Sequence, residues 1–427
     1  MSADLRARLF GLGSVQRLVR VFADDLAQGR SLLVLLPPNV ECDDVWEALG
    51  GELRQRECDA RAVYADEIAP GQSILSSVAD SLGVQWPASD TQRTVENLLG
   101  CDGLPEIIFC KGFDRDPSGR VPAWLELLSR WAEVAQNTNR PAALCLIVRA
   151  SSVIDHVPAT NVRLAVRWWW GVPSLLELRL LCREELGEDR SQEADNAWRE
   201  HLLPALSGGD ISLASDLWAT VCAGEGEICE ALTLHARARG WSGAALRAWG
   251  AHNVLGDSFA RAGLGQRPAK PLERLWAEGV VHYTREHGAE LQTAALYLLG
   301  QHEAVRHRIW RGQASLLLPI IDGVRLNLCR RLTEIYGRGW SLRWIPPAKE
   351  REYNALSESD YGCELGHLVH LLRACRDLRG HDGWIPLATQ ARDLRNELAH
   401  YRPISFVLFD EFWRALYAAE EGLVEAL

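Results

Sequence analysis

The hydrophobic positions in the first third of the chain alternate between short continuous apolar runs and longer stretches with helical spacing. The clear apolar runs lie at Ser31–Leu36, Glu106–Cys110 and Ala142–Val148, with a weaker strand candidate at Asp59–Tyr64 and a further candidate at Val162–Trp168. Runs of this length, closed by turn residues, are typical of strands that are buried on both faces. The helical stretches lie between them, at Leu5–Gln28, Asp43–Gln55, Ser73–Leu82 and Pro122–Asn137. Strands separated by helices predict an α/β fold with a mostly parallel sheet.

From about Ser174 onward the spacing of the apolar residues is helical, and no strand is expected. Helical segments of the middle region lie at Leu175–Leu186, Asp195–Leu206 and Ala244–Trp249, and those of the last region at Ala314–Tyr336, Glu364–Arg379, Trp384–His400 and Phe406–Gly422. Long helices joined by short loops predict an antiparallel bundle. With Gly263–Pro271 as a polar boundary, we expect an α/β domain at residues 1–173, an all-α connector at 174–270 and a helical bundle at 271–427.

Composition and charge narrow the class of protein. With 427 residues, 47% of them hydrophobic and 24% charged, the chain is long enough for two or three globular domains. The formal net charge of −11 argues against a generally basic surface, so any contact with RNA must be local. No apolar run reaches the roughly 20 residues of a membrane span. The 11 cysteines form no CxxC pair and no zinc-ligand spacing, and without a secretory signal we expect a cytoplasmic protein.

Two other groups of residues receive structural interpretations. Tryptophan is frequent, with 17 residues that include the run Trp168-Trp169-Trp170, and we expect these rings to anchor cores and interfaces. Glu364, His367 and His370 lie at the spacing of one helix face. Because no fourth ligand lies nearby in the sequence, we assign no metal to them.

The junction after Leu36 occupies the place where a P-loop ATPase carries the motif GxxxxGK[ST]. It reads Pro37-Pro38-Asn39-Val40-Glu41-Cys42-Asp43-Asp44, without a glycine or a lysine. Its three carboxylates would repel a triphosphate, and its two prolines lack the amide N–H groups that bind phosphate in such loops. A catalytic ATPase is therefore not expected.

Downstream, the segment Ile107–Asp114 resembles a Walker B strand, although Asp114 and Asp116 precede Pro117 and are interpreted as turn residues, not metal ligands. Over roughly the first 170 residues, the order of elements resembles that of AAA-like and STAND ATPases. This resemblance implies a degenerate P-loop ATPase-like scaffold with no assigned cofactor. A residual nucleotide sensor and an unrelated α/β domain are the alternatives.

The hexamer Arg395-Asn396-Glu397-Leu398-Ala399-His400, near the end of a helical stretch, carries groups suited to cutting RNA without a metal. Histidine exchanges a proton near neutral pH, and arginine binds phosphate and offsets negative charge that develops on it. Asn396 and His400 are four residues apart and share one helix face. Arg395 must swing round to reach that face, and Arg392, four residues before Asn396, extends it.

The hexamer resembles the RNxxxH signature of HEPN domains, which are helical bundles of prokaryotic toxins, antiviral effectors and CRISPR-associated ribonucleases. The resemblance covers about the last 115 to 125 residues. It implies a metal-independent endoribonuclease in which His400 transfers the proton, Arg395 steadies the charge on the phosphate and Asn396 orients the phosphate or His400. Arg392, Tyr401 and Arg402 would line the RNA cleft.

A single motif provides one histidine, whereas cleavage needs an acid and a base. The HEPN resemblance therefore implies a homodimer or a partner that carries a second motif. Together with the ATPase-like region, it implies a bacterial antiphage-defence or conflict-system protein with further defence subunits as partners. The alternative is a non-catalytic scaffold whose bundle dimerises or binds RNA, with His400 at the helix end for structural reasons.

Overall fold

The computed structural model describes residues 8–86, 93–113, 119–137, 142–186, 192–254, 263–284, 286–344, 354, 356–374 and 384–424. The chain divides into two compact units. Unit 1 comprises Met1–Leu181, Ser207–Ser215 and Ala236–Leu299, and unit 2 comprises Cys182–Leu206, Asp216–His235 and Gly300–Leu427. This division does not test the three consecutive domains expected from the sequence, which stay a prediction. No helix in the described part of the chain is both long enough and apolar enough to cross a membrane.

Unit 1 contains a five-stranded parallel sheet, as the apolar runs predicted. Its strands are β1 (Ser31–Leu36), β2 (Ala60–Tyr64), β3 (Ile107–Lys111), β4 (Ala143–Arg149) and β5 (Leu164–Trp168), in the order β2-β3-β4-β1-β5. Leu33 of β1 lies opposite Leu146 on one side and Val166 on the other. All of β1 is buried, whereas only Val63 is buried in β2. The weaker apolar run of β2 follows from its position at the edge of the sheet.

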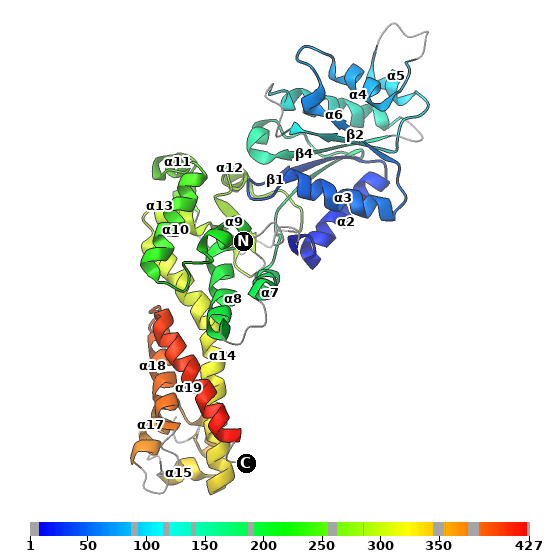
Figure 1. The fold of residues 1–427 in the computed structure, drawn as a ribbon. Coiled ribbons are helices and arrows are strands. Elements are labelled where there is room, and N and C mark those ends of the chain that lie inside the picture. The colour runs from blue at the N-terminus through cyan, green and yellow to red at the C-terminus, as the bar shows by residue number, and fades with distance from the viewer. Residues whose placement is uncertain are drawn as a thin grey trace. The chain divides into compact units, whose positions relative to one another are not determined.

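Helices cover both faces of the sheet, so the expected α/β class is confirmed for this region (Figure 1). On one face α2 (Gly13–Ala27) packs against α3 (Cys42–Gln55). On the other, α6 (Val121–Ala135) contacts β1 and β4, with α4 (Ile74–Leu82) and α5 (Val95–Leu99) beside it. Asp114 and Asp116, weighed above as turn residues, lie outside the described residues.

The helices that follow β5 are α7 (Leu175–Leu186), α8 (Glu193–Ser207), α9 (Ile211–Leu217), α10 (Glu225–Ala238), α11 (Gly243–Ala248), α12 (Lys270–Ala277) and α13 (Thr293–Leu298). A β-hairpin between α12 and α13 corrects the expectation that structure after Ser174 is purely helical. Its strands β6 (Val281–Thr284) and β7 (Gly288–Leu291) are antiparallel. With four residues each, they are too short to give a periodic signal. Packing decides this segment instead, because the Tyr283 ring lies 5.4 Å from that of Trp170.

The tryptophan run at the end of β5 anchors the core of unit 1, as expected. Trp168, Trp169 and Trp170 are all buried. The Trp168 ring lies 5.1 Å from that of Trp276 on α12, and Trp276 Nε1 donates to the Trp169 carbonyl at 3.2 Å. These contacts join α12 to the sheet.

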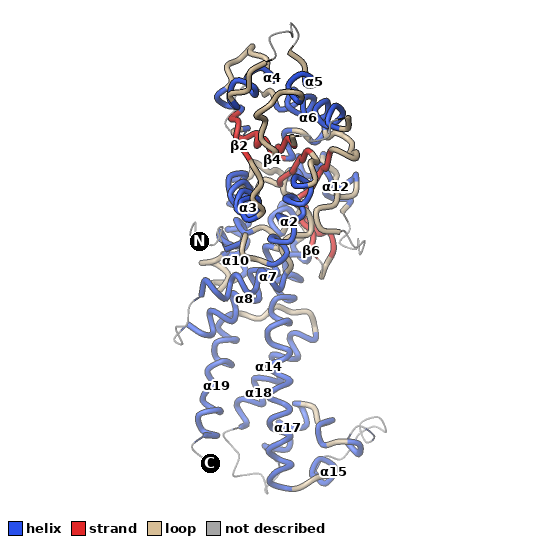
Figure 2. Tube along the Cα trace, turned by 90° about the vertical axis from the view of Figure 1, so that its right-hand side faces the viewer, coloured by secondary structure: helices blue, strands red, loops and turns tan. Residues whose placement is uncertain are grey.

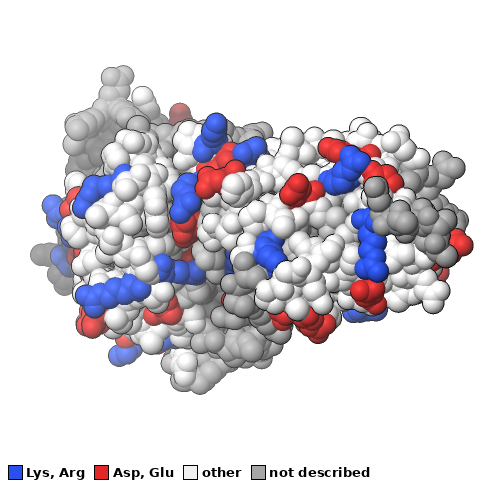
Figure 3. Space-filling model, turned by 90° about the horizontal axis from the view of Figure 1, so that it is seen from above, with Lys and Arg blue, Asp and Glu red and all other residues white. Residues whose placement is uncertain are grey.

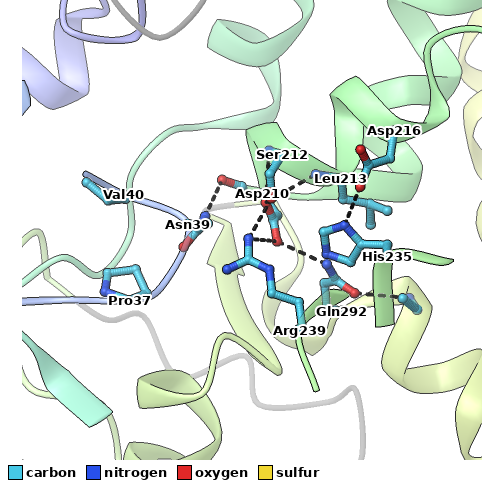
Figure 4. A network of polar contacts seen from close by, with 12 residues as sticks. Pro37, Asn39, Val40, Asp210, Ser212, Leu213, Asp216, His235, Arg239 and Gln292 are labelled. Carbon is cyan, nitrogen blue, oxygen red and sulfur yellow. Dashed lines mark hydrogen bonds and ion pairs between the residues drawn. The ribbon is translucent and has the colours of Figure 1, made fainter. Parts of the chain in front are cut away.

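A buried carboxylate joins further segments of unit 1 (Figure 4). Asp210 Oδ1 accepts hydrogen bonds from the N–H groups of Ser212 and Leu213, at 3.0 and 3.2 Å, and so caps the start of α9. Its Oδ2 accepts from Gln292 Nε2 at 3.0 Å and lies 3.5 Å from Arg239 Nη2. Asp210 therefore holds α9, the end of α10 and the start of α13 together.

A second carboxylate, that of Glu177, caps two helices at once. Ser174 and Glu177 form a capping box at the start of α7, in which Ser174 N donates to Glu177 Oε2 at 2.9 Å and Glu177 N donates to Ser174 Oγ at 3.3 Å. The same carboxylate accepts from N and Oγ of Ser14, in the first turn of α2, both at 2.6 Å. Burial alone would raise the pKa of Glu177, but the hydrogen bonds from Ser14 and Ser174 outweigh it and lower that pKa.

Within its described residues, unit 2 is helical (Figure 2). Its longest helix is α14 (His302–Tyr336), and α15 (Trp340–Trp344), α17 (Leu365–Ala374), α18 (Trp384–Ala399) and α19 (Phe406–Val424) follow. α18 packs against α14, α17 and α19. α14 begins well before the predicted Ala314, because its first turns pack on α8: a Cβ at Gly312 would lie 3.1 Å from the Leu202 Cα. The helical class of this region is confirmed, and its likeness to HEPN bundles stays a prediction.

Side chains of α14 clamp the C-terminal end of α18. Trp310 Nε1 donates to the Leu398 carbonyl at 2.8 Å. Gln313, which is 1% exposed, donates from Nε2 to the Ile404 carbonyl and accepts from the Ile404 N–H at Oε1, both at 2.9 Å. This pair satisfies both backbone groups of a buried residue that no helix satisfies. The segment between Leu398 and Ile404 is therefore fixed against α14 at both ends.

We predict that Glu177→Gln lowers the free energy of unfolding by roughly 1–2 kcal/mol at pH 7. The amide NH2 that replaces one carboxylate oxygen cannot accept from the N–H of Ser14 or Ser174, and the hydrogen bonds to the remaining oxygen lose their charge. Because the pKa of Glu177 is lowered by folding, its contribution is present above the unfolded-state pKa of about 4.3 and is lost as the pH falls through the lower folded-state value. Urea unfolding of both proteins from pH 7 to pH 3 measures this difference. A difference that stays constant over that range would contradict the assignment.

We predict that Gln313→Leu lowers the free energy of unfolding by roughly 2–5 kcal/mol, because it strands the buried N–H and C=O of Ile404. Hydrogen exchange at the Ile404 amide should accelerate with it. The matched control is Gln390→Leu on α18, whose Oε1 is buried and accepts no hydrogen bond from the described residues. The same substitution there should change stability little, and equal effects at the two sites would refute the role of Gln313.

Candidate functional site

The distribution of charged side chains on the face in Figure 3 does not indicate a binding site. On the face that Figure 3 shows, basic and acidic residues are interspersed. The net charge of −11 likewise gives no broad attraction for polyanions. The candidate site has to be identified from local geometry.

The RNxxxH hexamer lies where α18 ends. Arg395 and Asn396 belong to the last turns of the helix, and His400 follows its last residue, Ala399. The His400 N–H donates to the Asn396 carbonyl at 3.2 Å and to the Glu397 carbonyl at 3.1 Å. The side chains of Arg395, Asn396 and His400 are exposed. All three are therefore accessible to a ligand in solution.

The chain reverses immediately after His400 in a Schellman motif. Tyr401 N donates to the Leu398 carbonyl at 3.1 Å, and Arg402 N donates to the Glu397 carbonyl at 3.0 Å. Tyr401 takes the left-handed position of this motif, with φ of 57°. Glycine usually occupies this position, since a side chain there costs about 1 kcal/mol. A residue held in such a conformation against its preference is a reason to look for a role of its ring.

The Tyr401 ring belongs to a short row of aromatic rings. Its centroid lies 4.8 Å from that of Trp310 and 6.5 Å from that of His307, both on α14. The Tyr401 side chain is 67% exposed, and His307 is exposed too. We call His307, Trp310 and Tyr401 the ring row. It presents flat aromatic surface beside His400, and Arg402 follows it in an ion pair with Glu397 at 3.7 Å.

A cavity of about 410 Å³ lies further along the same helix, between α14, the start of α17 and α18. Three of the predicted residues line it: Arg392, Arg395 and Asn396. Arg395 Nη1 lies 3.5 Å from Asn396 Oδ1, and Arg392 bonds Asp393 at 2.7 Å. His400 is not among the lining residues. The predicted residues are therefore distributed along one helix, from the cavity to the ring row.

The remaining walls of the cavity come from residues that the sequence did not single out for this site. They are Leu318, Ile321, Asp322 and Arg325 on α14, and Glu364, Leu365 and Gly366 at the start of α17. Arg325 Nε donates to Asp322 Oδ1 at 2.8 Å, and its Nη1 donates to the carbonyls of Tyr361 and Cys363. It fixes the loop that leads into α17. No local sequence motif predicts that these residues line the cavity, because only folding brings α14 and α17 beside α18.

Of the two histidines considered as metal ligands, His367 contacts the start of its own helix and His370 is exposed. The Glu364 N–H donates to His367 Nδ1 at 3.4 Å, a bond that helps to start α17. Among the residues that the structure describes, no group of three or more His, Cys, Asp or Glu side chains is arranged to hold a metal ion. The candidate site accordingly rests on the arginines, Asn396, His400 and the ring row.

At the junction after β1 in unit 1, backbone and side-chain oxygen atoms accept hydrogen bonds from the guanidinium group of Arg149. Arg149, at the end of β4, donates from Nη1 to the carbonyls of Pro37 and Val40 and from Nη2 to Glu41 Oε2, the last at 2.6 Å. The following helix α3 has Asp43 and Asp44 in its first turn. Ligands of open α/β sheets bind outside the strand ends where the strand order reverses, which is this junction. The junction presents carboxylate and carbonyl oxygens at this position, and the degenerate ATPase-like scaffold stays a prediction.

Comparison with known proteins leaves the family open. No protein-family model matches the chain, and no curated protein matches it either.

Proposed function

We propose that this protein is a metal-independent endoribonuclease of the HEPN type that acts as a dimer, in a bacterial defence or conflict system. The observation that carries the proposal is the accessibility of Arg395, Asn396 and His400 on consecutive turns at the end of α18. The system-level role rests on the resemblance of the RNxxxH hexamer and of the element order alone.

The chemistry needs only groups of the RNA and of the motif. A ribose 2′-oxygen attacks the adjacent phosphorus, and the bond from phosphorus to the 5′-oxygen of the next nucleotide breaks. His400 takes the proton from the 2′-hydroxyl or gives one to the leaving 5′-oxygen. Arg395 stabilises the charge on the phosphoryl oxygens. The products are a 2′,3′-cyclic phosphate and a 5′-hydroxyl.

The dimer follows from the count of proton-transfer groups. Each chain contributes one His400, while the reaction uses both an acid and a base. A second copy related by twofold symmetry provides the second histidine through the same surface. The exposure of the motif leaves it available for such pairing.

The ring row supports a single-stranded nucleic acid as the ligand. Every base has a flat face that stacks on an aromatic ring, and such stacking tolerates any sequence. Tyr401 offers its ring next to His400 at 67% exposure, on a backbone conformation that disfavours it. An unpaired base on Tyr401 would place the backbone of its strand beside the motif.

A second candidate function is RNA binding without cleavage. One observation favours it: the cavity that Arg392, Arg395 and Asn396 line does not include His400. In that case the arginines and the ring row hold RNA, and His400 only follows the end of the helix.

We expect the purified protein to cut single-stranded RNA in the presence of EDTA, and His400→Ala to lower the rate by about 10²-fold or more, the usual contribution of a proton-transfer group. End-group mapping should find the cyclic phosphate on one product. The matched control is His370→Ala, another exposed histidine of unit 2, which should cut like wild type. Equal rates for wild type and His400→Ala would refute the role of His400. Binding without any cutting would favour the second candidate.

We expect Tyr401→Gly to weaken binding of single-stranded RNA by about 1–3 kcal/mol, since one stacking surface is lost. Stability should stay within about 1 kcal/mol of wild type, because glycine relieves the left-handed backbone strain. Fluorescence anisotropy with labelled RNA and thermal unfolding measure the two effects. Tyr417→Ala serves as control, a tyrosine of α19 that packs on Trp413 at 5.9 Å. RNA binding unchanged by Tyr401→Gly would exclude the ring row as a binding surface.

A further inference from the structure

The cavity of unit 2 is larger and has more apolar walls than a site for a phosphate group alone would need. It measures about 410 Å³ and lies between three helices. Leu318, Ile321 and Leu365 give it apolar walls, and the latter two side chains are buried. A volume of this size falls within the range of sites for small organic ligands, about 300–1,000 Å³.

The charged residues of the cavity divide into engaged and available groups. Arg325 is held by Asp322 and by the carbonyls that precede α17, so these two residues form part of the wall. Arg395 has a single hydrogen bond to the described residues, at 3.5 Å to Asn396. Arg392 contacts Asp393 next to it. Arg395 can therefore bind an anionic oxygen without losing a contact of the cavity wall, and Arg392 can do so by sharing its guanidinium between the ligand and the exposed Asp393.

Glu364 adds an acceptor opposite these donors. It lines the cavity at the start of α17, and its side chain is exposed. A carboxylate only accepts hydrogen bonds, so it favours a ligand with hydroxyl or amino groups and disfavours a second phosphate. The ligand that suits all the walls has one anionic group, one apolar planar part and hydroxyl donors.

We propose that this cavity binds one ribonucleotide, with its phosphate on Arg392 and Arg395, its base against Leu318, Ile321 and Leu365, and a ribose hydroxyl on Glu364. Inorganic phosphate would leave the apolar walls exposed to water. An apolar ligand would make no hydrogen bond to either guanidinium group. A deoxyribonucleotide lacks the 2′-hydroxyl by which proteins distinguish RNA from DNA.

The inference deepens the proposed function and rests on it, because it identifies the occupant as a nucleotide of the RNA substrate. Arg395 and Asn396 belong both to the cavity and to the motif. His400 follows Asn396 by one helical turn. A nucleotide in the cavity would thus hold the strand while the neighbouring phosphate lies toward His400. A free nucleotide offers the same chemistry, and the experiment distinguishes the two sources.

The glycines of unit 2 provide the test variant and its control. Gly366 lines the cavity, and a Cβ built on it meets nothing within 4 Å. Gly366→Leu therefore introduces a side chain into open space next to the site without straining the helix. Gly323 on α14 is also helical and also has nothing within 4 Å of a Cβ, yet it is not a lining residue. Gly323→Leu is the matched control.

The experiment measures ligand binding by calorimetry on the full chain with His400→Ala, which removes cutting from the readout. The probes are a tetramer of riboadenylate, its deoxy counterpart and free adenosine monophosphate. We expect Gly366→Leu to weaken binding of the ribose tetramer at least about tenfold and Gly323→Leu to leave it unchanged. We also expect weaker binding of the deoxy tetramer, and loss of this preference for ribose in Glu364→Ala, which removes the acceptor.

The outcomes separate this inference from the proposed function. If adenosine monophosphate alone binds and Gly366→Leu abolishes it, a free nucleotide is sufficient; if only the tetramer responds, the nucleotide is read within a strand. Tetramer binding that is equal in the Gly366→Leu and Gly323→Leu proteins overturns the inference, as does equal binding of ribose and deoxy tetramers. Cavity-dependent binding by a chain that never cuts RNA would refute only the nuclease. Cutting that is unaffected by Gly366→Leu would refute only the subsite.

Discussion

One buried amide fixes the geometry on which the candidate site depends. Gln313 pairs with both backbone groups of Ile404, and Trp310 holds the carbonyl of Leu398. Between these two points the chain has to leave α18, reverse and approach α19. The positions of His400 and Tyr401 relative to α14 follow from this clamp and not from the helix itself. Without the clamp, the Schellman hydrogen bonds would still cap α18, but both backbone groups of Ile404 would lose their partner on α14.

In unit 1, polar side chains likewise fix neighbouring segments by hydrogen bonds to backbone groups. Glu177 serves the starts of two helices, and Asp210 links the starts of α9 and α13 to Arg239. Each carboxylate sits among N–H donors that the helices leave unsatisfied at their first turns. Arg149 does the converse at the junction after β1, where it satisfies carbonyls. The acidic chain thus uses part of its charge internally, at points where segments distant in sequence meet.

The parts of the fold that the sequence predicted are those with a long or strong local signal. β1, β3 and β4 coincide with continuous apolar runs, since parallel strands that are buried on both faces need hydrophobic residues throughout, whereas β2 and β5 have weaker patterns interrupted by arginine. The hairpin of β6 and β7 was not predicted because strands of four residues cannot show a period, and its packing against Trp170 is not visible in the local sequence. For the site, the hexamer marked Arg395 and Asn396, but Arg325 and Glu364 approach them only through the packing of α14 and α17. Such neighbours have no signature in one sequence.

The left-handed backbone of Tyr401 has a consequence for recognition in general. The Tyr401 ring is tilted by 46° against the Trp310 ring, with 4.8 Å between the centroids, and this contact restricts its orientation in the unbound state. Part of the conformational entropy that a flexible side chain loses on binding is therefore lost already on folding. The unbound protein already carries the backbone strain, so a planar ligand would bind a preorganised surface. The cost of this preorganisation is a lower stability of the fold.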